Sequence, residues 1–167
     1  MKARIHPALW GVSISSILTI CTGGGFRSRI MAVLLGQRTG LRTAYAGTTA
    51  DWQGRVNPHA TAVLEHAGIY DRPLISHQVR AGEIAAAGIV VCAERRHREQ
   101  LCEMYPEAAE KMFTLAELAG PRQGQSGAGV EDVADPTPIA HLGRRLTLDE
   151  LLPTFHEIRA AVERIAL

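Results

Sequence analysis

Apolar and polar positions along the chain follow two alternating periods. Between short apolar runs, apolar residues recur at helical spacing, as Ile30, Val33 and Leu34 do. Runs this short favour strands, and a continuous one such as Ile-Val-Val-Cys suits a strand buried on both faces. The pattern predicts strands at 17–20, 43–46, 89–92 and, more weakly, 112–115.

Glycines and prolines mark where the predicted helices begin and end. The first helix follows the glycines at 23–25 and runs until Gly36 and Gly40. A second helix begins at Pro58, since proline suits the first helical position, and stops at Gly68.

Two further helices are predicted in the second half of the chain. A charged helix extends from Glu94 to about Met104. The closing helix begins at Thr147 and Glu150, which have the spacing of a capping box. Its apolar stripe comprises Leu151, Phe155, Ile158, Val162 and Ile165.

Strands that alternate with helices predict an α/β fold. Right-handed crossovers then give a doubly wound four-stranded parallel sheet with helices on both faces. The chain of 167 residues is long enough for one core, so we expect one domain over 1–167, with 1–14 as an extension. Ligands of such folds bind beyond the carboxyl ends of the strands.

Charge and cysteine content narrow the function classes. The net charge is only +1 and basic residues are interspersed with acidic ones, which argues against partners such as nucleic acid or a membrane surface. The apolar start is interrupted by Pro7 and Gly11, so it favours a strand over a secretory signal. Three widely spaced cysteines indicate no disulfide framework and a reducing compartment, the cytoplasm.

The segment between the first strand and the first helix carries the strongest chemical signal. It reads Cys21-Thr22-Gly23-Gly24-Gly25-Phe26-Arg27-Ser28. Glycines allow the backbone to turn its amides inward, and the helix amino terminus adds partial positive charge. Such a cradle binds a tetrahedral dianion and favours the thiolate of Cys21, which is the nucleophilic form.

Arg27 and Ser28 complete this cradle. The planar guanidinium of Arg27 can hold two phosphoryl oxygens and stabilise the transition state, and Ser28 can hydrogen-bond to Cys21. A nucleotide-binding loop is excluded because no lysine follows the glycines and no G-x-G-x-x-G spacing occurs.

Cysteine, five residues, arginine and serine, directly after an amino-terminal strand, resembles the signature of the low-molecular-weight protein tyrosine phosphatases. The resemblance implies Cys21 as nucleophile, Arg27 as phosphoryl clamp and Asp135 of an Asp-Pro pair as general acid, with Asp132 as the fallback acid. Trp52 is implied as a wall of the substrate pocket. The substrate-binding residues expected are Thr22, Gly23, Gly24, Gly25, Phe26, Ser28 and Trp52.

The resemblance also implies the reaction. The protein would hydrolyse a phosphorylated protein or a small phosphomonoester through a phosphocysteine intermediate, with no cofactor and no metal ion. The histidines show no spacing that would form a metal site, and the run at 94–98 reads as a solvated helix face.

Four departures from the family pattern leave the substrate open. Gly24 replaces an asparagine that braces the loop, which implies a looser cradle. Phe26 replaces a second loop cysteine, and Arg29 replaces a proline. Thr137 and Pro138 replace aromatic residues that sandwich a phenol ring.

Two other functions fit part of the pattern. Arsenate reductases of the thioredoxin-linked type share the loop and use two further cysteines, for which Cys92 and Cys102 are candidates, although their separation favours two unrelated thiols. A catalytically weak phosphate-binding regulatory protein would keep the cradle and Arg27 without turnover. The joint presence of nucleophile, arginine, serine and Asp-Pro favours the enzyme.

Overall fold

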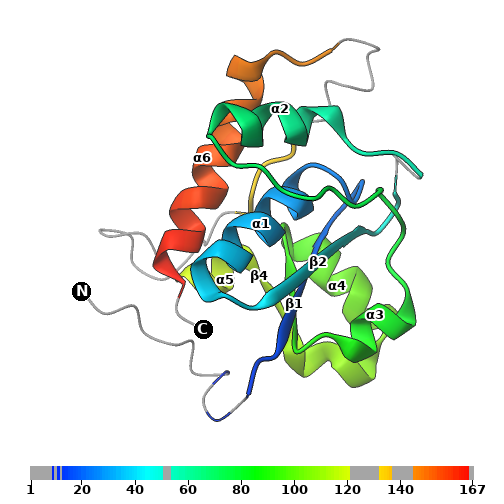
Figure 1. Cartoon of the computed structure of the whole chain (residues 1–167). Helices are drawn as coiled ribbons and strands as arrows, with labels where there is room; N and C mark the ends of the chain where they lie inside the picture. The colour runs from blue at the N-terminus through cyan, green and yellow to red at the C-terminus, as the bar shows by residue number, and fades with distance from the viewer. Residues whose placement is uncertain are drawn as a thin grey trace.

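The fold is built on a four-stranded parallel sheet. The computed structural model describes residues 9, 11, 13–50, 54–120, 132–136 and 145–165. The strands are β1 (Ser16–Cys21), β2 (Arg42–Gly47), β3 (Ile89–Cys92) and β4 (Met112–Thr114), and their order in the sheet is β2-β1-β3-β4. All neighbouring pairs are parallel. β1 is therefore central, and its carboxyl end is flanked by those of β2 and β3 (Figure 1).

Helices cover both faces of the sheet. α1 (Arg27–Thr39), α2 (Pro58–His66), α5 (Leu115–Ala119) and α6 (Leu148–Arg164) share the larger core with side chains from one face. α3 (Ala81–Ala86), α4 (Arg95–Met104) and the 3-10 helix η2 (Pro106–Lys111) cover the other (Figure 1). This arrangement confirms the predicted α/β class and the doubly wound four-stranded parallel sheet.

Local signals explain where the longer helices begin and end. Gly40 ends α1 in the left-handed region, at φ +71°, where glycine carries no steric penalty. Asn57 caps α2 by accepting a hydrogen bond of 2.9 Å from the backbone N–H of His59. Thr147 and Glu150 form the predicted capping box of α6, in which Glu150 accepts from the Thr147 backbone N–H at 2.8 Å.

The sequence pattern missed α3, α5 and η2, which have five or six residues each. Fewer than two turns leave too little periodicity to recognise. The fourth strand is shorter than predicted because Leu115 begins α5, for which Thr114 is the cap and accepts from Glu117 N at 3.0 Å. Within the described part of the chain, no helix has the length and apolar character to cross a membrane.

A buried ion pair joins α1 to the segment that follows α2. The side chain of Arg29 is 2% exposed, and its Nε and Nη2 donate to the two carboxylate oxygens of Asp71 at 3.0 and 2.6 Å. Nη1 also donates to Thr61 Oγ1 at 2.8 Å. Arg29 therefore ties α1, α2 and the segment around Asp71 together.

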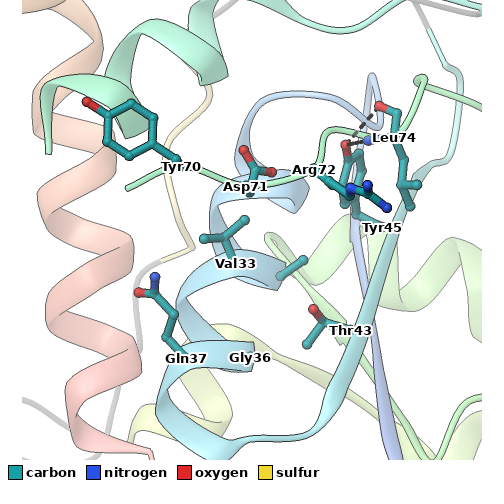
Figure 2. Close-up of a pocket in the computed structure, with 10 residues that line it drawn as sticks. Val33, Gly36, Gln37, Thr43, Tyr45, Tyr70, Asp71, Arg72 and Leu74 are labelled. Carbon is teal, nitrogen blue, oxygen red and sulfur yellow. Dashed lines mark hydrogen bonds between the residues drawn. The ribbon is translucent and has the colours of Figure 1, made fainter. Parts of the chain in front are cut away.

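A pocket of about 370 Å³ lies beside this junction, between α1, β2 and the segment around Asp71 (Figure 2). Tyr45 forms one wall, and its hydroxyl both donates to Leu74 O at 2.8 Å and accepts from Leu74 N at 2.6 Å. Tyr70 is 81% exposed at the pocket. None of the described residues that were predicted for the phosphate site lines it.

Candidate active site at the carboxyl end of β1

The predicted cradle lies where the central strand meets the first helix. Cys21 is the last residue of β1, and Arg27 is the first residue of α1. The Sγ of Cys21 lies 3.2 Å from Ser28 Oγ, so the serine hydroxyl can donate to the sulfur when it is a thiolate. Thr19 Oγ1 donates to Ser28 O at 2.7 Å and ties the start of α1 to β1.

Two of the loop glycines are required by close packing. Gly24 has φ +66°, and a Cβ on it would lie 2.5 Å from the backbone nitrogen of Gly47. A Cβ on Gly47 would in turn lie 2.5 Å from Gly24 N. At Gly25, a Cβ would lie 2.5 Å from Ser76 Oγ and 2.9 Å from Asn57 Cβ. A side chain at 24 or 47 would therefore displace backbone, and one at 25 would displace the side chains of Ser76 and Asn57.

The main chain after β2 supports the cradle. The backbone N–H of Thr48 donates to Cys21 O at 2.9 Å, and those of Thr49 and Ala50 donate to Thr22 O at 2.9 and 3.2 Å. Ala50 adopts a left-handed φ of 50°, which is rare for a residue with a side chain and marks a tightly determined turn. Backbone hydrogen bonds therefore support the loop at Cys21 and Thr22. The looser cradle expected without the asparagine stays a prediction.

Arg27 lies at the centre of a charged network. Its side chain is 2% exposed and contacts two carboxylates. Nη1 pairs with Glu94 Oε1 and donates to Val133 O at 2.9 Å. Nη2 donates to Asp135 Oδ2 at 2.9 Å and, more weakly, to Thr22 Oγ1 at 3.4 Å. These contacts hold the Arg27 guanidinium next to the loop and bury it almost completely.

Glu94 is a carboxylate of the site that the sequence pattern placed elsewhere. It precedes α4 and is held between Arg27 and Arg96, whose Nε donates to Glu94 Oε2 at 2.6 Å. Partial burial raises the pKa of Glu94, but the hydrogen bonds from Arg96 and Arg27 outweigh it and lower that pKa to about 2. Glu94 is therefore ionised across the ordinary pH range.

His97 is also part of the site. It lies in the first turn of α4 but is only 1% exposed, and its Nε2 lies 2.8 Å from Thr22 Oγ1. Burial, together with the nearby charge of Arg27, lowers the pKa of His97 to about 4, so the imidazole is neutral at pH 7.

The run at 94–98 is thus not simply a solvated face. The available signal was its position, because it directly follows the carboxyl end of β3, the edge at which such folds bind ligands.

Residues 132–136, which we call the acidic loop, contact the same network through Val133 and Asp135. Asp135 reaches Arg27, as the predicted general acid must if it is to approach a bound phosphoryl group. Asp132, the fallback acid, instead accepts a hydrogen bond of 2.9 Å from the backbone N–H of Arg95. Val133 N donates to Ala93 O at 3.1 Å and fixes the loop to the end of β3.

The remaining predicted residues divide into two groups. Phe26 is 4% exposed and belongs to the core beside α1, so only its backbone can face a ligand. Trp52, Thr137 and Pro138 lie outside the described residues. Among the residues that the structure describes, no group of histidine, cysteine and carboxylate side chains could hold a metal ion.

The other two cysteines lie on the opposite side of the sheet from Cys21. Cys92 pairs in register with Ile20 and shares its core, whereas Cys21, one residue further along β1, belongs to the core on the other face. Burial raises the pKa of the Cys92 thiol, which disfavours its reactive form. Cys102 on α4 packs against the same core as Cys92.

Comparisons with known proteins agree with this architecture. A protein-arginine-phosphatase of Geobacillus stearothermophilus is 33% identical over 122 residues, which cover 72% of this chain and 77% of the relative. The solved structure of the YwlE arginine phosphatase from that organism matches with a TM-score of 0.72 at 28% identity, over 90% of this chain and 89% of the other.

A tyrosine phosphatase structure shares the fold at lower identity. The tyrosine phosphatase amsI of Erwinia amylovora matches with a TM-score of 0.74 at 19% identity, over 92% of both chains. The family model for low molecular weight phosphotyrosine protein phosphatases matches residues 16–166. Loop, sheet order and sequence agree, and the chain belongs to the low molecular weight phosphotyrosine protein phosphatase family.

Proposed function

We propose that this protein removes phosphoryl groups from phosphorylated proteins through a phosphocysteine intermediate. The observation that carries the proposal is the convergence of four side chains at the carboxyl end of β1. Cys21 lies 3.2 Å from Ser28, and Arg27 follows the same loop and pairs with Asp135. Nucleophile, thiolate stabiliser, phosphoryl clamp and acid are the groups that this two-step reaction needs.

In the first step, the Cys21 thiolate attacks phosphorus, and the bond from phosphorus to the leaving atom breaks. A protonated Asp135 gives its proton to that atom. The incoming phosphoryl oxygens take the place of Asp135 on Nη2 of Arg27, which frees the carboxyl group to reach the leaving group.

In the second step, water attacks the phosphocysteine. The Asp135 carboxylate accepts a proton from this water, the sulfur–phosphorus bond breaks, and inorganic phosphate leaves with the thiolate restored. Ser28 donates to the sulfur in both steps and so stabilises it as a leaving group.

Phosphoarginine is the substrate that we favour. The relative at 33% identity is a protein-arginine-phosphatase. The carboxylate of Asp135 borders the cradle with 17% of its side chain exposed, and a carboxylate pairs well with a guanidinium. The residues after the Asp-Pro pair are threonine and proline rather than the aromatics that sandwich a phenol.

Phosphotyrosine is the alternative substrate, because the matching family model describes phosphotyrosine phosphatases. Arsenate reduction by a disulfide relay is less well supported, since Cys92 and Cys21 face opposite cores. The need for a reduced Cys21 thiol fits a reducing compartment such as the cytoplasm.

One assay separates these functions. A phosphoarginine peptide, a matched phosphotyrosine peptide and p-nitrophenyl phosphate are compared, with Cys21→Ser as control and a chelator in parallel. We expect kcat/KM at least about 10-fold higher for phosphoarginine and no effect of the chelator. A reversed preference would assign the protein to phosphotyrosine, and turnover that survives Cys21→Ser would refute the mechanism. Phosphate binding without turnover would support the regulatory function.

A further inference from the structure

A second guanidinium reaches the phosphate loop from α4. Arg96 donates from Nη2 to Thr22 Oγ1 at 2.9 Å and to Glu94 Oε1 at 3.0 Å, and from Nε to Glu94 Oε2 at 2.6 Å. Its side chain is nevertheless 57% exposed. A solvated arginine on a helix face needs no fixed partner. Three hydrogen bonds hold the Arg96 side chain in one orientation at the edge of the buried site.

The hydroxyl of Thr22 links Arg96 to Arg27 and His97. The Thr22 hydroxyl has two lone pairs and one proton. Arg27 and Arg96 both donate to its oxygen, so its proton is directed to His97 Nε2, 2.8 Å away. His97 is then the neutral tautomer with its proton on Nδ1, a buried atom without a hydrogen-bond partner in the described part of the chain.

The charges explain what Arg96 can do for the reaction. Glu94 pairs with Arg27, and a carboxylate at this place weakens the attraction of Arg27 for a phosphoryl dianion. Arg96 binds both oxygens of Glu94 and offsets this charge. Without Arg96, Arg27 would be the only arginine or lysine among the described residues to pair with Glu94, and it would also pair with Asp135.

We propose that Arg96 is a positioning residue of the phosphate cradle, which neutralises Glu94 and shares the Thr22 hydroxyl with Arg27 so that Arg27 stays available to the phosphoryl group. The inference rests on the proposed phosphatase function. Arg96 itself does not contact the phosphoryl group, and it acts through Glu94 and Thr22.

The test measures binding of inorganic phosphate to Cys21→Ser protein by calorimetry at fixed ionic strength. In this background, Arg96→Ala should raise the Kd for phosphate about 10-fold, and Arg96→Lys, which keeps the charge but not the fork, about 3-fold. Arg95→Ala is the matched control, because it removes the same charge from an exposed neighbour. It should change the Kd by less than about 2-fold.

A double-mutant cycle distinguishes positioning from direct contact. With Glu94→Gln present, Arg96→Ala should change the Kd for phosphate by less than about 2-fold, because no carboxylate remains to be neutralised. An undiminished 10-fold effect would mean that Arg96 does not act by neutralising Glu94 and would overturn the inference. Equal effects of Arg95→Ala and Arg96→Ala would overturn it as well, since they would show a general surface-charge effect.

Failure of the proposed function gives a different result. Because phosphate binding is measured without the nucleophile, absent turnover by the wild-type chain would refute the phosphatase proposal while the Arg96 cycle could still succeed. In the wild-type background, Arg96→Ala should lower kcat for p-nitrophenyl phosphate, and Arg96→Lys should restore part of it. Thermal denaturation shows whether each variant is folded. If Arg96→Ala is not folded, the test uses Arg96→Lys instead.

Discussion

Arg27 and Arg29 lie two residues apart on α1, and both side chains are 2% exposed, yet they occupy different kinds of site. Arg29 binds one carboxylate, Asp71, with two parallel hydrogen bonds, and Thr61 takes a third. Arg27 divides its hydrogen bonds among separate segments of the chain, which include Glu94 and Asp135. The hydrogen bonds of Arg29 serve the fold alone. Those of Arg27 are the ones that, in the proposed reaction, a bound phosphoryl group would partly replace.

The difference teaches how to tell a structural buried charge from a functional one. A bidentate pair such as Arg29 with Asp71 satisfies its partners within the fold, so nothing is gained by exchanging them. The exposed fractions of the carboxylates are similar, at 13% for Asp71 and 16% and 17% for Glu94 and Asp135, so the difference is that the partners of Arg27 come from separate segments of the chain. In the proposed reaction, a phosphoryl dianion would take the place of Asp135 on Nη2 of Arg27 and release that carboxyl group toward the leaving group.

The largest expected effect on the Arg27 side of the comparison comes from Cys21→Ser. Turnover should fall by on the order of 10⁴-fold or more, since a serine hydroxyl is a far weaker nucleophile than the Cys21 thiolate. Phosphate should still bind to the purified variant, because Arg27 and the backbone remain. Steady-state kinetics and calorimetry measure both. Near wild-type turnover would remove the basis for assigning the site.

Asp135→Asn should have the next largest effect. With an alkyl phosphate or phosphoarginine, kcat should fall about 10²- to 10⁴-fold because the leaving group needs a proton. With p-nitrophenyl phosphate, phosphorylation should be nearly spared, and the intermediate should accumulate as a burst. Asp132→Asn is the control, because Asp132 bonds to the Arg95 backbone. If Asp132→Asn gives this pattern and Asp135→Asn is silent, the acid has been wrongly assigned.

Arg29→Ala sharpens the other side of the comparison. It leaves Asp71 largely buried without its partner, so the free energy of unfolding should fall by about 3 kcal/mol, the lower end for a broken buried pair. Activity per folded molecule should change less than about 3-fold. Urea unfolding and kinetics of the folded fraction provide the measurements, with the exposed Arg42→Ala as control. A large loss of kcat with an unchanged free energy of unfolding would contradict a structural role for Arg29.

The smallest expected effect concerns pH and His97. Its pKa is about 4 when folded and 6.5 in the unfolded chain, so between these values the unfolded state binds more protons. The stability that neutral His97 contributes is present above pH 6.5 and is lost as pH falls to about 4, by on the order of 1–3 kcal/mol. His97→Gln should flatten this slope in urea unfolding, with His66→Gln as control. An unchanged slope would place the titration elsewhere.

Local sequence determined much of the fold. The runs at 17–20, 43–46 and 89–92 lie within strands, the fourth run forms a strand over 112–114, and Gly40 and the pair Thr147 and Glu150 mark helix ends as predicted. These features depend on period and on residues close together in the chain, which a single sequence displays directly. The cysteine loop between the first strand and the first helix could be located for the same reason.

The tertiary structure decided the partners of Arg27 and the support of its loop. The sequence predicted a solvated helix face for Glu94, Arg96 and His97, but all three contact the loop or Arg27. Helical periodicity does not show which strand end lies next to the start of a helix. The contact of Gly24 with Gly47 depends on the register of β1 with β2. Such contacts join segments more than twenty residues apart in the sequence. Only the packing of the sheet brings these segments into contact.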